Sequence, residues 1–110
     1  MKFLADLSRE LVCKFDGAEV RFDPTKATLV WKRVSYWDTG SLCSGSDEEY
    51  FFIQDKKCLI LRYPRRGFFR KRLDPPHLHE HNESDMRSFL VIAQCSPEIV
   101  EQHFGEQRFG

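Results

Sequence analysis

The pattern of apolar and polar positions predicts a helix at each end of the chain, with strands between them. Residues 3–14 carry apolar side chains three and four positions apart, with charged residues on the other side. This spacing predicts an amphipathic helix, which Asp16-Gly17 would end. Residues 18–23 and 26–37 are rich in β-branched and aromatic residues and predict strands, with an irregularity expected at Lys32-Arg33.

A β-hairpin is predicted in the middle of the chain. Residues 50–54 and 58–63 are apolar runs on either side of Asp55-Lys56-Lys57, which is typical of two strands joined by a turn. The polar residues 44–48 before the hairpin predict a loop. Residues 64–76 begin and end with proline and predict a long loop, which in a compact domain is usually functional.

The last third of the chain contains one ambiguous segment, residues 84–94. Its apolar run favours a buried strand, whereas Met86, Phe89 and Leu90 have helical spacing and Ser84 could cap a helix, so both interpretations stay open. Ser96 followed by Pro97 predicts the start of a closing helix. The expected fold is a single α+β domain over residues 1–110, with an antiparallel meandering β-sheet and an N-terminal and a C-terminal helix packed on one face.

Charge and cysteine content narrow the class of protein. The 110 residues hold 17 basic and 17 acidic side chains, so only local clustering can indicate a polyanionic partner. The four cysteines are far apart, which indicates reduced thiols in an intracellular protein and no disulfide framework. No apolar run reaches membrane-spanning length and the N-terminus is too charged for a signal peptide, so a cytoplasmic location is expected.

Basic residues cluster between positions 56 and 72, where no acidic side chain intervenes. Arginine matches phosphate oxygens with its planar fork, and unpaired bases can stack on aromatic rings. The alternative is a solvated loop whose phenylalanines simply fold beneath it. The nucleic-acid-binding interpretation assigns contacts with the backbone and bases to Arg66, Phe68, Phe69, Arg70, Lys71 and Arg72.

Three histidines follow at alternate positions, His77, His79 and His81. In an extended segment they share one side, and imidazole can both accept and donate a proton near neutral pH. His77 and His79 are therefore candidates for acid/base catalysis, with Arg62 or Arg65 stabilising the charge on phosphorus. Two other interpretations stay open: plain surface histidines, or a zinc site completed by His81, Asp74 or Glu83. No cofactor is expected.

Residues 50–83 resemble the TumE-type toxins of bacterial toxin–antitoxin modules. The resemblance rests on a hairpin pattern followed by a P-H-x-H element, matched here by Tyr50, Asp55, Leu59, Ile60, Arg62, Tyr63, Pro76, His77 and His79. It implies a small toxin that damages RNA, is neutralised by a cognate antitoxin, and has its site at Arg62, His77 and His79. Pro64-Arg65 stands where the family usually has Asp-Asn, so any chemistry of that pair in relatives is missing here.

The sequence therefore predicts a toxin-like, metal-independent ribonuclease with RNA and an antitoxin as partners. The alternative is a non-catalytic module that binds nucleic acid or protein, such as a phage- or plasmid-encoded inhibitor of a host system. Regulation by DNA binding has no helix-turn-helix signal in its favour. The oligomeric state is left open, and a homodimer is one of the assemblies considered.

Overall fold

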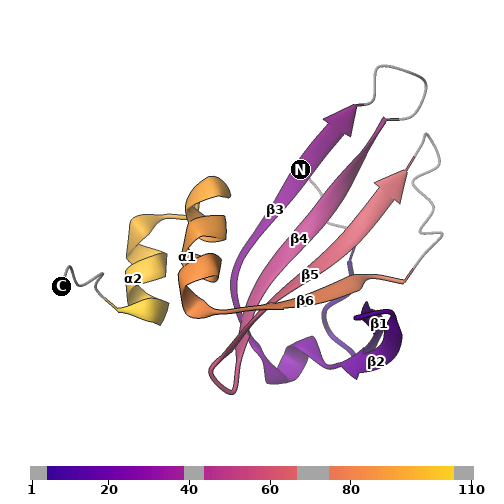
Figure 1. The fold of residues 1–110 in the computed structure, drawn as a ribbon, viewed down its shortest axis with the longest axis horizontal. Helices are drawn as coiled ribbons and strands as arrows, with labels where there is room; N and C mark the ends of the chain where they lie inside the picture. Colours follow the sequence, from indigo (N-terminus) through magenta and orange to yellow (C-terminus); the bar gives the residue numbers. More distant parts are fainter. Residues whose placement is uncertain (1–4, 39–43, 67–74, 106–110) are drawn as a thin grey trace.

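A six-stranded mixed sheet in the order β2-β1-β6-β5-β4-β3 is the centre of the fold (Figure 1). The computed structural model describes residues 5–38, 44–66 and 75–105, and for Trp37, Asp38, Ser44, Arg65 and Arg66 it describes the backbone but not the side chains. The elements are β1 (Leu11–Phe15), β2 (Ala18–Phe22), the 3-10 helix η1 (Pro24–Lys26), β3 (Thr28–Asp38), β4 (Ser44–Gln54), β5 (Lys57–Arg66), β6 (His77–His81), α1 (Glu83–Ile92) and α2 (Pro97–Phe104).

The expected arrangement of the fold is wrong at the N-terminus and in the sheet. The predicted helix over residues 3–14 does not form, because Leu11–Phe15 is strand β1 and no helix occurs among described residues 5–10. Asp16 and Gly17, with φ of 50° and 79°, form the two-residue turn that joins β1 to β2. β1 also pairs in parallel with β6, so the sheet is mixed, and both helices follow the sheet in the chain.

The strands of the central hairpin are longer than their apolar runs indicate. Residues 44–48, predicted as a loop, belong to β4, and β5 continues through Pro64, where a long loop was expected to begin. The hairpin itself is confirmed, with Asp55 and Lys56 both at positive φ in its turn. The irregularity expected at Lys32-Arg33 lies instead between Leu29 and Trp31.

The ambiguous segment is a helix. α1 spans Glu83–Ile92, and its cap is Asn82, whose side chain accepts a hydrogen bond from the Asp85 amide at 2.7 Å. The closing helix is confirmed, with Ser96 as its N-cap and Pro97 at its first position.

Each face of the sheet buries a separate core. On one face, Phe22 of β2 meets Phe52 of β4 with ring centroids 5.2 Å apart, although three strands lie between β2 and β4 in the sheet order. The sheet must therefore curl toward this face, which also buries Cys13, Tyr50, Leu59, Leu61, Tyr63 and Leu78.

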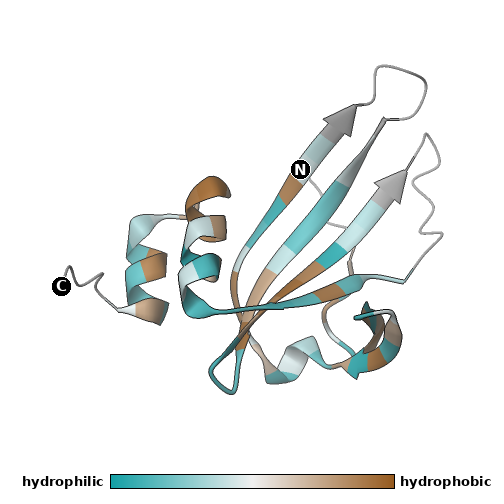
Figure 2. Cartoon of the chain, in the orientation of Figure 1, coloured by the Kyte–Doolittle hydropathy of each residue, from teal (hydrophilic) through white to brown (hydrophobic). Residues whose placement is uncertain are grey.

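The other face is covered by α1 and α2, which lie side by side (Figure 1). Met86 and Leu90 of α1, both fully buried, pack on Phe51, Cys58 and Ile60. The helices cover only one end of this face, where the strands are most apolar, and the strands continue beyond them with more polar sequences (Figure 2). Of the elements in the described part of the chain, no helix covers the rest of this face, where His77 and His79 lie.

Three of the four cysteines lie in the described residues. Cys13, Cys58 and Cys95 are buried and unpaired, as predicted, and burial raises the pKa of the Cys13 thiol to about 11. Of the helices in the described part of the chain, none combines the length and apolar character that crossing a bilayer requires.

We expect the helix-covered core to be a main source of stability. Leu90→Ala should lower the free energy of unfolding by about 3 kcal/mol, because Leu90 is fully buried among the residues of α1 and the sheet. Val91→Ala is the matched control, since Val91 is 70% exposed and should change stability by less than about 0.5 kcal/mol. Urea unfolding of both variants checks this, and equal losses would contradict it.

Candidate functional site

A row of charged side chains crosses the open part of the helix-covered face. Cross-strand pairing aligns Arg33 of β3 with Glu49 of β4, Glu49 with Arg62 of β5, Arg62 with His77 of β6, and His77 with Lys14 of β1. Directly paired residues in a sheet have Cβ atoms about 4.5–5.5 Å apart, so each member is the neighbour of the next. We call these five residues the charged row.

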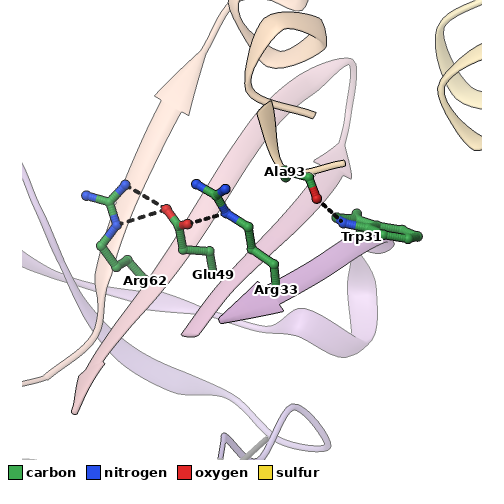
Figure 3. A network of polar contacts seen from close by, with 5 residues as sticks. All are labelled: Trp31, Arg33, Glu49, Arg62 and Ala93. Atoms are coloured by element: carbon green, nitrogen blue, oxygen red, sulfur yellow. Dashed lines mark hydrogen bonds and ion pairs between the residues drawn. The ribbon is translucent and has the colours of Figure 1, made fainter. Parts of the chain in front are cut away.

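Glu49 is the central, buried member of the charged row. Its carboxylate accepts a hydrogen bond from Arg33 Nε at 2.6 Å and another from Arg62 Nη2 at 2.8 Å, and its side chain is only 6% exposed (Figure 3). A buried carboxylate needs such partners, because an unpaired charge in the interior is very costly. The two guanidinium groups remain 31% and 42% exposed, so both can still reach a ligand.

The paired charges leave the row positive. Arg33, Arg62 and Lys14 bring three cations against two carboxylates, those of Glu49 and of Glu19, which pairs with Lys14 across β1 and β2. The count leaves one positive charge in excess on a surface beside the histidines. Such a surface attracts anions.

His77, His79 and His81 lie on this same face, since they pair with Arg62, Ile60 and Cys58 respectively. The His77 and His79 rings are nearly parallel, with centroids 6.4 Å apart and an interplanar angle of 13°. The His79 side chain reaches solvent but is partly desolvated by its neighbours. This desolvation, and next the positive charge of Arg62, lower the pKa of His79 below its ordinary value of 6.5.

A groove of about 340 Å³ runs along this face beneath α1. Arg33, Glu49, Arg62 and His79 line its charged end. His79 is mostly neutral at pH 7, given the direction of its shift, and can therefore accept a proton from a bound group.

The structure brings together three of the four predicted catalytic residues. Arg62, His77 and His79 lie on one surface, because Arg62 pairs directly with His77 and His79 is two positions further along β6. The fourth, Arg65, belongs to β5, but its side chain is outside the described part, as is that of Arg66. The predicted nucleic-acid contacts Phe68, Phe69, Arg70, Lys71 and Arg72 also lie outside the described residues, so these assignments stay predictions.

The zinc interpretation finds no support in the described ranges. Among residues 5–38, 44–66 and 75–105, no three His, Cys, Asp or Glu side chains lie close enough to hold a metal ion. His79 and His81 have ring centroids 6.3 Å apart, and His81 instead packs edge-on against Phe89. Of the other two ligands considered, Glu83 begins α1 and belongs to no such group, and Asp74 is outside the described residues.

Three members of the charged row were missed by sequence reasoning. Residues 44–48 were predicted as a loop and Glu49 was given no role, but Glu48 and Glu49 are buried, on opposite faces of β4. Arg33 was treated only as a strand irregularity, and Lys14 as the polar side of a helix. The available signal was the opposite charge of Arg33 and Glu49, which becomes informative only when the strand register is known.

Comparison of this chain with family models, with curated proteins and with solved structures finds no match. The function therefore has to be argued from the charged row and the histidines themselves.

We expect Glu49 to stabilise the fold through its two ion pairs. Glu49→Gln should lower the free energy of unfolding by about 2 kcal/mol, because hydrogen bonds to charged groups typically contribute about 1.5–3 kcal/mol and glutamine cannot neutralise two guanidinium groups. The control is Glu80→Gln. Glu80 is 45% exposed and 3.7 Å from Lys57, so its loss should cost less than about 1 kcal/mol.

Urea unfolding of the two glutamine variants makes this comparison. If Glu49→Gln is no more destabilising than Glu80→Gln, the arginines of the charged row do not depend on Glu49.

Proposed function

We propose that this protein cleaves RNA without a metal ion, with His77 and His79 transferring protons and Arg62 binding the phosphate. The observation that supports the proposal is the placement of these three residues. Arg62 and His77 are direct cross-strand partners, and His79 is the next residue of β6 on the same face.

The spacing of the two imidazoles suits a phosphodiester. Their centroids are 6.4 Å apart, and a hydrogen bond from a ring nitrogen to oxygen spans about 2.9 Å, so one phosphate group can contact both rings. Arg62 is anchored by Glu49 and is still 42% exposed, which lets it bind phosphate without losing its own position.

Each histidine has a role in the proposed reaction. His79, whose pKa is lowered, is neutral and takes the proton of the 2′-hydroxyl group, while the 2′-oxygen attacks phosphorus. The bond from phosphorus to the 5′-oxygen breaks, and His77 in its protonated form gives a proton to that oxygen. The products are a 2′,3′-cyclic phosphate and a 5′-hydroxyl end, and Arg62 stabilises the extra negative charge during the step.

Neighbouring phosphates of the strand would contact the rest of the charged row. Lys14 lies next to His77, and Arg33 lies beyond Glu49, so the cations extend to both sides of the histidine pair. Such contacts bind the backbone without reading sequence. The basic residues 70–72 are proposed to add to this binding.

The proposal extends to a cytoplasmic toxin that a cognate antitoxin neutralises. It is supported by the resemblance of residues 50–83 to TumE-type toxins, which includes Arg62, His77 and His79. Expression of the chain alone should then arrest growth of a bacterial host, and the His79→Ala variant should not.

Purified protein incubated with single-stranded RNA tests the enzyme directly. The wild-type chain should cleave RNA equally with and without EDTA, and His77→Ala or His79→Ala should each reduce the rate by about 100-fold or more. His103→Ala is the matched control, because His103 lies in α2, away from the charged row, and its loss should leave the rate unchanged.

Intact RNA with the wild-type chain would contradict the proposed activity, and cleavage that EDTA abolishes would contradict its metal independence. If the histidine variants still bind RNA and still act in cells like the wild type, the chain is instead a non-catalytic binding module that uses the cations Lys14, Arg33 and Arg62 of the charged row.

A further inference from the structure

The groove beside the histidines has two chemically different ends. Its charged end contains Arg62 and His79, as described above. Two positions along the strands from Glu49 and Arg62 the lining becomes apolar, and α1 contributes its last turns to it. The residues there are Phe51, Ile60, His81, Phe89 and Ile92.

The apolar end is open at its rim. Ile92 is 66% exposed although it is one of the most hydrophobic side chains of α1, and the last turn of that helix is strongly hydrophobic (Figure 2). The Phe89 ring, one turn earlier in α1, is half-buried and contacts His81 edge-on, with centroids 4.7 Å apart. Two aromatic rings and an exposed aliphatic side chain therefore line the apolar end of the groove.

The end of α1 is held in place over the sheet. Trp31 of β3 donates a hydrogen bond from its indole nitrogen to the carbonyl oxygen of Ala93 at 3.2 Å (Figure 3). Ala93 directly follows Ile92 and is itself buried in the core. This contact fixes the helix end, so the position of Ile92 relative to the histidines is set by the fold and not by a loose terminus.

We propose that the apolar end formed by His81, Phe89 and Ile92 binds the base of a nucleotide whose phosphate lies against Arg62 and His79. The inference rests on the proposed function for its ligand class, RNA, and adds a subsite that this function does not require. A nucleotide combines an anionic group with a flat aromatic ring whose faces stack on aromatic and apolar side chains, and the groove offers partners for both at adjacent ends.

The size of the groove agrees with this ligand. Its volume of about 340 Å³ lies at the lower end of the range for small-molecule sites, about 300–1,000 Å³. One nucleotide, not an extended strand, would fill it. Stacking on aromatic side chains is tolerant of base identity, so the site should favour a base over no base more than it distinguishes among bases.

A second groove, between α1 and α2, supplies the matched control. It is lined by Val91, Arg87 and Val100 and contains none of the histidines. Val91 is 70% exposed, comparable to Ile92, and neighbours it in the chain, but it faces this second groove.

Titration of the full-length, ¹⁵N-labelled protein tests the site by NMR, with adenosine 3′-monophosphate and inorganic phosphate as the two probes. The nucleotide should bind the wild-type chain about tenfold more tightly than phosphate, since base stacking contributes a gain of about this size. Ile92→Ala should remove most of this advantage and leave phosphate binding unchanged. Val91→Ala should retain the full advantage.

Equal affinity of the wild-type chain for the two probes would overturn the base site, as would an Ile92→Ala variant that behaves like Val91→Ala. The outcome is separable from that of the ribonuclease assay. If the wild-type chain binds the nucleotide more tightly than phosphate but leaves RNA intact, the base site is supported and the ribonuclease activity is contradicted. If it cleaves RNA but binds the two probes equally, the activity is supported and the base site is contradicted.

Discussion

The ion pairs of Glu49 with Arg33 and Arg62 are the interaction on which the proposed site depends. A carboxylate that is 6% exposed in the middle of a sheet must be neutralised, and cross-strand neighbours on both sides do so. Glu49 affects the proposed function indirectly, by fixing the position of Arg62. Arg62 is held at a defined place beside His77 while part of its guanidinium group still faces solvent, so a phosphate can bind to a cation whose position is already determined.

The division of one sheet face into a covered end and an open end explains where this site lies. α1 and α2 bury the apolar strand segments around Phe51 and Ile60, and polar side chains occupy the same face beyond the helices. The groove forms at the boundary, where the last turn of α1 meets the histidines of β6. A ligand bound there would contact both a charged and an apolar surface, which is the chemical character of a nucleotide.

Turns and helix caps could be predicted because they depend on residues adjacent in the sequence. Strand pairing and the burial of Glu49 could not, because they depend on residues distant in the sequence. The turn at Asp55-Lys56 and the cap at Ser96 depend on neighbouring residues and are confirmed. Arg62 and His77 are direct cross-strand partners in the structure, while their catalytic roles stay predictions. The N-terminal helix was wrong because the spacing of Leu7 and Leu11 fits a helical period, whereas the turn at Asp16-Gly17 and the pairing of β1 with β2 and β6 favour a strand. Burial of Glu49 was missed because its partner Arg33 is distant in sequence.

The most direct measurement for the central claim is an NMR titration of the His79 imidazole in the wild-type chain and in Arg62→Gln. The account predicts a pKa below 6.5 in the wild type, from desolvation and from the charge of Arg62, so that His79 gains its proton only as the pH falls well below neutral. Removing the guanidinium charge should make the imidazolium more favourable and raise this pKa. An unchanged pKa in Arg62→Gln would contradict the claim that Arg62 and His79 share one surface.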